Sequence, residues 1–309
     1  GMRYVIIGGS AAAIGCIEGV RSVDKTGEII LITGETEWNY SRPLISYLLE
    51  GKTTRDKMWC RPDSFFTRNG VTVKAGVLAT TLDAGDRTVR LSTGERLAYD
   101  RLLAATGSRP FVPPIPGLET VERTFCFQTL SDASALAEAL RPESRVLILG
   151  AGLTGVKCAE GIRGLCAQIA IADLAPRVLP AVLDDTAAAM VQARMEEKGV
   201  RFYLNDSAAA FRGNTARLQS GTELEFDVLV TAVGVRPNTQ LVADAGGAVD
   251  RGILVDGRCA TTLPDVYAAG DCAQGYDAVS GEKRMLPLWP NAMLQGETAG
   301  INMAGGRAD

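Results

Sequence analysis

Three glycines in the middle of the chain have the spacing of a loop that binds a dinucleotide. Gly150, Gly152 and Gly155 follow an apolar run and precede a helical pattern, which predicts a strand, a glycine loop and a helix in that order. The first glycine allows a tight turn, the second lets a pyrophosphate approach the backbone, and the third lets helix and strand pack closely. The helix N-terminus supplies N–H donors for the phosphates. Asp173 ends the next apolar strand, where a carboxylate can bind a ribose diol.

The N-terminal segment carries a less complete copy of the same loop. Gly8 keeps the first glycine, whereas Ser10 and Ala13 replace the second and third with residues that are still small. Glu35 follows the next strand and is placed to act as the ribose acid. Taken alone, this motif is as typical of a packing turn as of a nucleotide site.

Two internal repeats relate the two loops. Residues 3–21 match residues 145–163, and residues 99–110 match residues 226–237. Repeats this far apart are too long for solenoid units, so they indicate two copies of one domain architecture. The repeat therefore favours a nucleotide site in the first copy as well.

The hydrophobic pattern predicts the elements that must hold these loops. Each copy reads strand, turn, helix, strand, and the strand after the helix lies at 29–33 or 169–172, which indicates a βαβ unit with a parallel, buried sheet. Residues 71–75 and 88–92 are predicted to be strands of a smaller antiparallel meander. The prolines within 109–117 exclude a helix or a central strand there and predict a linker.

Together these elements predict an α/β fold of two Rossmann-like, three-layer dinucleotide-binding domains, each with a small antiparallel β-meander. The second domain is inserted in the first. We predict one domain from residues 1–112 with 236–309 and the other from residues 113–235, which suits a chain of 309 residues.

Composition excludes several other classes of protein. Lys and Arg number 32 against 36 Asp and Glu, and no basic patch is long enough to follow a nucleic-acid backbone. The absence of histidine excludes Ser–His and Cys–His catalysis and every metal site that needs histidine, and no metal is predicted. No apolar run approaches the ~20 residues of a membrane span. Seven cysteines without a Cys-x-x-Cys pair predict a reduced, cytoplasmic chain with structural thiols.

Residues 266–271, Val-Tyr-Ala-Ala-Gly-Asp, complete a pattern that resembles a known family. With the two glycine loops in this order, the whole chain resembles the two-dinucleotide flavoproteins of the pyridine nucleotide–disulfide oxidoreductase superfamily. The resemblance implies that Asp271 binds the ribityl chain of FAD and that Ala79 contacts adenine through its backbone. It also implies that the helix beginning near Trp289 and Ala292 faces the flavin pyrimidine with its N-terminus, where it stabilises negative charge on the reduced ring.

The pair Arg42–Pro43 is similar to the rubredoxin, ferredoxin and nitrite reductase flavoproteins, in which this loop lies against the isoalloxazine. The residues predicted to bind FAD are Gly8, Ser10, Ala12, Ala13, Glu35, Arg42, Pro43, Ala79, Ala105, Thr106, Gly107, Gly270, Asp271, Trp289 and Ala292. The residues predicted to bind the nicotinamide dinucleotide are Gly150, Gly152, Thr154, Gly155, Asp173, Arg177 and Gly234.

The chain also departs from the family pattern. Members that use thiols carry a redox cysteine where this chain reads 40–47 without one, and Cys60 comes too late to match. Tyr47 stands where relatives have Lys, and Lys157 stands where they have its Glu partner. This predicts Lys157 and Arg42 as catalytic residues at the flavin–nicotinamide contact; alternatively, Lys157 is a solvent-facing residue that pairs with Glu160. The C-terminal interface domain usual in the family is absent from the sequence, so the oligomeric state stays open.

These observations predict an FAD-dependent oxidoreductase that takes hydride from NAD(P)H and passes electrons to a protein, such as rubredoxin or an iron–sulfur protein, or to a small acceptor. NADH is favoured over NADPH because Asp173 puts a carboxylate where a 2′-phosphate would sit, although Arg177 follows closely. Two alternatives remain open: an NADH oxidase or an enzyme like coenzyme A disulfide reductase, and a nucleotide-sensing flavoprotein without turnover.

Overall fold

The computed structural model describes residues 1–276 and 291–309. Its contacts divide the chain into two units: Gly1–Tyr40, Trp59–Arg109 and Arg236–Asp309 form the first, and Ser41–Met58 and Pro110–Val235 form the second. The segment Ser41–Met58 therefore groups with the second unit, whereas the sequence pattern had assigned it to the first domain. The reason is that its helix α2 (Ile45–Leu49) packs against α5 (Leu153–Ile162) and α4 (Leu130–Ala139) of that unit.

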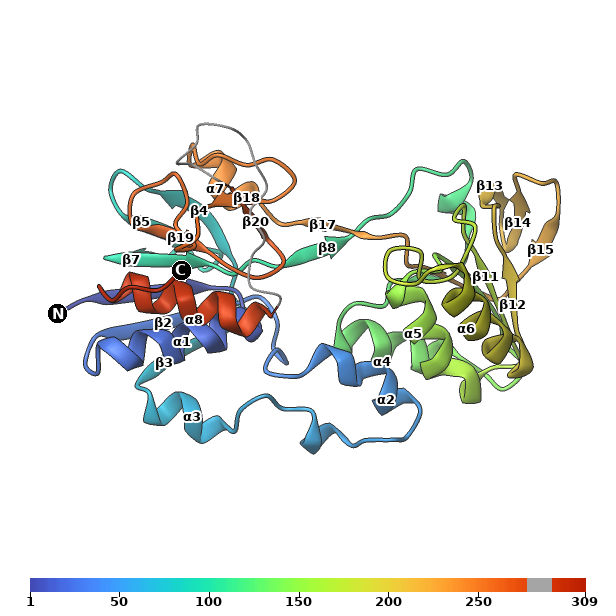
Figure 1. Cartoon of the computed structure of the whole chain (residues 1–309), viewed down its shortest axis with the longest axis horizontal. Coiled ribbons are helices and arrows are strands. Elements are labelled where there is room, and N and C mark those ends of the chain that lie inside the picture. Colours follow the sequence, from blue (N-terminus) through green and yellow to red (C-terminus); the bar gives the residue numbers. More distant parts are fainter. Residues whose placement is uncertain (277–290) are drawn as a thin grey trace. The chain divides into compact units, whose positions relative to one another are not determined.

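The first unit is built on a five-stranded sheet in the order β19-β7-β1-β2-β3, in which every pair is parallel. Three helices cover one face of the sheet and a three-stranded meander covers the other (Figure 1). The sheet comprises β1 (Arg3–Ile7), β2 (Glu28–Thr33), β3 (Val71–Ala75), β7 (Arg101–Ala104) and β19 (Val266–Ala268). The helices are α1 (Ala11–Val23), α3 (Asp63–Arg68) and α8 (Ala292–Met303), and the meander is β4 (Ala79–Asp83), β5 (Thr88–Leu91) and β6 (Arg96–Ala98). The unit also contains α7 (Gln240–Asp244) and the strand pair β18 (Ile253–Val255) and β20 (Ala273–Gly275).

The apolar run in β1 is buried on both faces, as the sequence predicts for a central parallel strand. Alternate residues serve the two layers: Ile6 and Leu31 pack towards α1 and α8, whereas Ile7 and Ile30 pack towards the meander. The carboxyl ends of β1, β2 and β7 are in register, so the loop that follows β1 emerges at one edge of the sheet.

Residues 71–75 do not belong to the meander, and that expectation is wrong. They form β3, which pairs in parallel with β2 at the edge of the main sheet. The residue types Val71, Thr72 and Val73 alternate as in an antiparallel strand, and an edge strand tolerates the polar positions because it is buried less completely than a central one. Strand β5, in contrast, lies in the meander as predicted.

The second unit repeats the same order of elements, which confirms the Rossmann-like α/β fold with parallel sheets (Figure 1). Its sheet has the order β12-β11-β10-β16-β9, and its meander packs on one face through Phe211, Leu218 and Phe226. The sheet comprises β9 (Thr124–Phe125), β10 (Arg145–Leu149), β11 (Gln168–Ala172), β12 (Val200–Tyr203) and β16 (Val228–Thr231). The meander is β13 (Ala208–Arg212), β14 (Thr215–Leu218) and β15 (Glu223–Glu225). The third helix of this unit, beside α4 and α5, is α6 (Asp185–Glu197).

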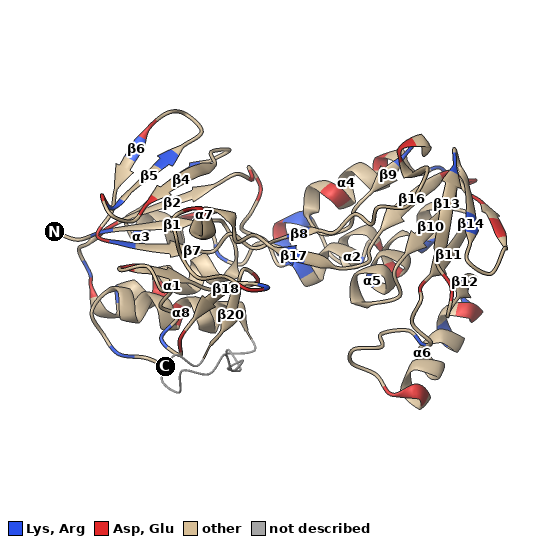
Figure 2. Ribbon diagram, turned by 90° about the horizontal axis from the view of Figure 1, so that it is seen from above, with Lys and Arg blue, Asp and Glu red and all other residues tan. Residues whose placement is uncertain are grey.

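After the segment Ser41–Met58, the chain passes into the second unit again through β8 (Ser108–Pro110) and returns through β17 (Val235–Pro237), and these two strands pair with each other. Charged residues of both signs are spread over each unit (Figure 2). None of the helices in the described part of the chain combines the length and apolarity needed to span a membrane.

Candidate dinucleotide-binding sites

Gly8 occupies a position that only glycine can take. Its φ is +109°, and a Cβ there would overlap the carbonyl oxygen of Ala105 at the end of β7. The amide of Gly8 donates to the carbonyl oxygen of Ile32 at 2.7 Å. Gly8 is therefore fixed between the ends of the neighbouring strands β2 and β7, and the backbone turns directly into α1.

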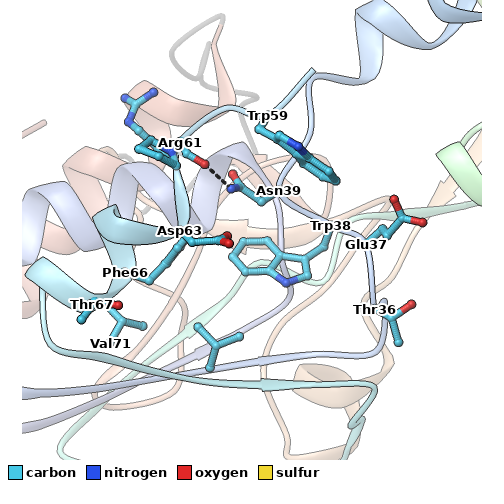
Figure 3. A pocket seen from close by; sticks show the side chains of 12 residues that line it. Thr36, Glu37, Trp38, Asn39, Trp59, Arg61, Asp63, Phe66, Thr67 and Val71 are labelled. Carbon is cyan, nitrogen blue, oxygen red and sulfur yellow. Dashed lines mark hydrogen bonds between the residues drawn. The ribbon is translucent and has the colours of Figure 1, made fainter. Parts of the chain in front are cut away.

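Trp38 supports the glycine loop from the side. A Cβ on Gly9 would lie 2.8 Å from two atoms of the Trp38 indole, which packs edge-on against Phe66 with ring centroids 5.1 Å apart. Figure 3 shows Trp38 in the wall of a cleft of about 520 Å³, where Asn39 donates to the carbonyl oxygen of Arg61. The indole thus separates this cleft from the glycine loop.

Helices α1 and α8 pack with their backbones in close contact through four glycines. A Cβ on Gly15 or Gly19 would overlap carbonyl oxygens of α8, and a Cβ on Gly296 or Gly300 would overlap carbonyl oxygens of α1. The contacts advance in the same direction along both helices, so the helices are parallel and both N-termini lie at one edge of the unit. Sequence reasoning missed this packing, although two glycines four residues apart in each segment were its signal.

The predicted pair Gly270–Asp271 lies at the first turn of α1. Gly270 has a φ of +85°, and a Cβ there would lie 3.2 Å from the Cβ of Ala12. Its amide donates to the side-chain oxygen of Gln295 on α8 at 2.9 Å. Asp271 is exposed directly after it. Gln295, which the sequence pattern did not single out, therefore fixes the turn that presents Asp271.

Asn238 is a second residue that sequence reasoning missed. Its side chain donates to the carbonyl oxygen of Thr106 at 2.8 Å, its amide donates to Gly107, and its carbonyl oxygen accepts from the Thr106 hydroxyl at 2.7 Å. Asn238 thereby locks the segment Ala105–Thr106–Gly107 that follows β7. Its place after the repeated Arg-Pro pair was the available signal.

The predicted ribose acid and adenine contact are brought to the same edge of the sheet. The segments that carry Glu35 and Ala79 touch, because a Cβ on Gly34 would overlap the side chain of Leu78. The amide of Val77 donates to the carbonyl oxygen of Thr33 at 3.1 Å and fixes this contact.

The remaining predicted FAD residues divide into three cases. Ala292 is the first residue of α8, as expected for a helix that begins near the site. Arg42 and Pro43 open a one-turn helix, Arg42–Leu44, within the segment that groups with the second unit, and their contact with flavin stays a prediction. Trp289 lies outside the described residues.

In the second unit, the predicted dinucleotide loop opens onto a cleft of about 420 Å³. Gly150 has a φ of +117°, and a Cβ there would overlap the carbonyl oxygen of Ala232; a Cβ on Gly155 would overlap that of Gly150. Four predicted residues line the cleft together, and sequence reasoning missed several neighbours, most of them apolar. The predicted ones are Gly152, Thr154, Asp173 and Gly234, and the additional ones include Leu153, Leu174, Pro180, Ser207 and Val233.

Asp173 and Arg177 have different surroundings. The two carboxylate oxygens of Asp173 accept from the amides of Ala151 at 2.7 Å and Ala175 at 2.9 Å, which fixes the carboxylate beside the glycine loop. Arg177 is not among the residues lining the cleft. Its guanidinium instead donates to the carbonyl oxygens of Leu183 at 2.8 Å and Pro180 at 3.0 Å.

Helix caps distinguish the two helices that follow the glycine loops. Among the helices of ten or more residues in the described ranges, α4, α6 and α8 begin with a side-chain cap from Thr129, Asp184 and Asn291. Helices α1 and α5 begin at Ser10 and Gly152 without one, and neither has an acidic residue in its first turn. Their first N–H groups are therefore left for another acceptor, so both loops fit the pyrophosphate of a dinucleotide.

Lys157 lines a smaller cleft between α5 and α6, together with Glu160, Arg194 and Lys198. No ion pair joins Lys157 to Glu160 among the described residues, and Lys157 is not among the residues lining the dinucleotide cleft, so its role at the flavin stays a prediction. Tyr47, which replaces the family lysine, has another cation over its ring: Nζ of Lys52 lies 5.8 Å from the ring centre.

All seven cysteines are free thiols. Burial raises the pKa of the half-buried Cys60 thiol, and the nearby Arg61 guanidinium only partly opposes this. Burial likewise raises the pKa of Cys259 to about 12 and that of Cys166 to about 11. These thiols stay protonated at neutral pH and are poor nucleophiles.

Comparison with known proteins agrees with this geometry. The family model described as pyridine nucleotide-disulphide oxidoreductase matches residues 2–296. The chain is 33% identical to the NADH-dependent phenylglyoxylate dehydrogenase subunit epsilon of Aromatoleum evansii, over 98% of this chain and 72% of that protein. It is 28% identical to the rubredoxin-NAD(+) reductase of Pseudomonas putida, over 98% of this chain and 80% of that one.

Among solved structures, the fold matches a chain in the crystal structure of the covalent putidaredoxin reductase–putidaredoxin complex, with a TM-score of 0.89 and 26% identity over 99% of this chain and 76% of that chain. Two glycine loops at the ends of parallel strands, two uncapped helices and a match along nearly the whole sequence lead to one conclusion: the chain belongs to the pyridine nucleotide-disulphide oxidoreductase family and is a flavin-dependent NAD(P)H oxidoreductase.

Proposed function

We propose that this chain moves electrons between NADH and a protein redox partner, with FAD held by the first unit and NADH by the second. One observation carries the proposal: the segment from Tyr40 to Tyr47 holds no cysteine, and burial keeps thiols such as Cys60 protonated. Without a thiolate relay, electrons must leave from the flavin to an external acceptor. The relatives named for rubredoxin and for the putidaredoxin complex support a small redox protein as that acceptor.

The chain's own residues bind and orient the two dinucleotides. The N-termini of α1 and α5 donate to the pyrophosphates, and Glu35 and Asp173 bind the ribose diols. Asp271, held by the turn at Gly270, binds the ribityl chain, and the N-terminus of α8 stabilises negative charge on the reduced ring. FAD, when bound, supplies the two-electron chemistry by accepting hydride from the reduced nicotinamide.

The proposal is tested by anaerobic reduction with NADH followed by a screen of acceptors. We expect the purified protein to be yellow, to bleach with NADH, and to be reoxidised by oxidised rubredoxin or a [2Fe–2S] ferredoxin at least ~10²-fold faster than by dioxygen or coenzyme A disulfide. Fastest reoxidation by coenzyme A disulfide or dioxygen would support the reductase or oxidase alternatives, and a yellow protein that NADH does not bleach would support a sensor.

We assign the reaction to a reducing compartment, the cytoplasm, because all seven cysteines are unpaired.

We also propose a preference for NADH over NADPH, and predict that the double variant Asp173→Asn, Leu174→Arg reverses it. The fixed carboxylate of Asp173 repels a 2′-phosphate, and Leu174 is 60% exposed beside it in the cleft, where an arginine can pair with that phosphate. We expect the ratio of kcat/KM for NADH over NADPH to fall by about 10²-fold, which is ~2.8 kcal/mol. Leu174→Arg alone is the control for the added charge, and an unchanged ratio in the double variant would refute the role of Asp173.

Lys157→Met is predicted to lower the flavin midpoint potential by tens of millivolts and to slow reduction by NADH, with FAD content unchanged. The family position puts this cation near bound flavin, where attraction to the reduced ring is at most ~4 kcal/mol at about 4 Å and an effective dielectric near 20, and less with exposure. About 30 mV corresponds to ~1.4 kcal/mol for a two-electron couple. Spectroelectrochemistry and stopped-flow reduction measure both quantities. Glu160→Gln is the matched control, and an unchanged midpoint with an unchanged rate in Lys157→Met would make Lys157 a surface residue.

A further inference from the structure

We propose that Arg177 is a positioning residue that shapes the nucleotide cleft and does not bind the 2′-phosphate of NADPH. It holds residues 178–184, named here the cleft loop, so that Pro180 forms part of the cleft wall. The inference rests on the proposed use of the second unit's cleft by NADH. An arginine four residues after the ribose acid is otherwise the obvious candidate for a phosphate ligand.

The guanidinium of Arg177 links two backbone carbonyl groups of the cleft loop. Nε donates to the carbonyl oxygen of Leu183 at 2.8 Å and Nη2 donates to that of Pro180 at 3.0 Å. Nη1 lies 3.4 Å from a carboxylate oxygen of Asp185, the first residue of α6. All three nitrogens therefore have partners in the cleft loop or at the start of α6, and the planar guanidinium fixes their relative directions.

The other side of the cleft loop is tied to the glycine loop. The amide of Leu179 donates to the carbonyl oxygen of Ala151 at 2.8 Å, and the carbonyl oxygen of Leu179 accepts from the amides of Val182 and Leu183. Leu179 has a φ of +48°, which a branched, non-glycine residue adopts only when its surroundings impose it. The bonds of Arg177 are part of those surroundings, because they hold Pro180 and Leu183, which follow Leu179 in the chain.

This arrangement separates two roles that a cleft arginine could have. Pro180 lines the cleft beside Asp173 and Leu174, so the position of the cleft loop decides the shape of the cleft at the ribose end. To reach a phosphate, the guanidinium would have to leave the carbonyl oxygens of Pro180 and Leu183. The ion pair with Asp185 contributes little to holding the cleft loop, because the Asp185 side chain is 92% exposed. The two hydrogen bonds to the carbonyl oxygens of Pro180 and Leu183, which do not depend on charge pairing, hold the cleft loop and are named here the clamp.

Arg177→Met tests the inference, because it removes the clamp and the charge together. Steady-state kinetics with NADH and NADPH and calorimetric titration with NAD⁺ and NADP⁺ give the affinity for each dinucleotide. We expect KM and Kd to rise about 10-fold for both dinucleotides by the same factor, with kcat changed less than about twofold. Arg177→Lys keeps the charge but cannot bridge both carbonyls in the same plane, so we expect it to behave like Arg177→Met.

Two outcomes would overturn the inference: a loss confined to NADPH and NADP⁺, which identifies a phosphate ligand, or no change for either dinucleotide. Arg217→Met, which removes an exposed arginine of the meander, is the matched control and is expected to leave both affinities unchanged. FAD content and a thermal melt report folding, and if Arg177→Met does not fold, the same comparison is made with Arg177→Lys. A wild-type preference for NADPH would refute the proposed nucleotide choice. The clamp is tested separately, by whether the Arg177 variants lose affinity for both dinucleotides by the same factor.

Discussion

Gly8→Ala is expected to produce a protein that purifies with less than about a tenth of its FAD and with a markedly lower melting temperature. The φ of +109° at Gly8 already disfavours any side chain, by roughly 1–2 kcal/mol. The added Cβ would also overlap the carbonyl oxygen of Ala105, a backbone atom that moves only if β7 shifts relative to β1. Because this pair forms the centre of the first unit's sheet, both the binding loop and the fold are affected.

Flavin absorbance per protein and a thermal melt measure the two effects of Gly8→Ala. Gly94→Ala is the matched control, because Gly94 has a similar φ of +90° but no described atom lies within 4 Å of the added Cβ. It tests conformational strain without overlap, and we expect it to keep FAD with only a small loss of stability. Full FAD content in Gly8→Ala would show that the loop after β1 does not hold the cofactor.

The second large effect is expected from Gly152→Ala, which should raise the KM for NADH by about 10²-fold, or ~2.8 kcal/mol, and leave folding unchanged. Gly152 begins α5 with a φ of −78° and a ψ of −171°, an extended conformation that alanine adopts freely. No described atom lies within 4 Å of the added Cβ, so the folded chain itself has room for a methyl group. In the proposed binding mode a pyrophosphate approaches the backbone through this space, and the methyl group would fill it.

Gly152→Ala therefore separates binding from stability more cleanly than Gly150→Ala, whose Cβ would overlap Ala232. We expect an unchanged melting temperature, unchanged FAD content and a large loss of NAD⁺ affinity in calorimetry. Gly164→Ala, in the same unit and also without close neighbours, is the control. If Gly152→Ala binds NAD⁺ as the wild type does, the cleft at Asp173 is not the dinucleotide site.

The two glycine loops, the duplicated architecture and Asp173 could be predicted from the sequence, because each depends on local chemistry. A strand, a glycine at positive φ and a helix N-terminus are contiguous in the chain, so Gly8 and Gly150 are recognisable without knowledge of the rest of the fold. The ribose acid follows at the end of the next strand, and parallel pairing brings it to the loop, as it brings Asp173 to Ala151.

Features that depend on distant segments could not be predicted in this way. Residues 71–75 alternate like a meander strand, and only pairing with β2 places them at the edge of the parallel sheet. The residues that fix the loops of the predicted FAD site, Trp38, Asn238 and Gln295, act across long stretches of sequence, so no local pattern identifies their partners. The grouping of Ser41–Met58 likewise follows from packing of α2 on α5 and not from its place in the chain.

Arg177 shows most clearly what each level of information determined. The sequence determined that a cation follows the ribose acid closely, and on that basis Arg177 is predicted to contact the dinucleotide. Only the tertiary structure decided where the guanidinium goes, because the carbonyl oxygens of Pro180 and Leu183 face it at hydrogen-bonding distance only after the chain turns at Leu179. A motif specifies which groups are near in the chain, whereas the folded backbone decides which acceptors a long, flexible side chain can reach.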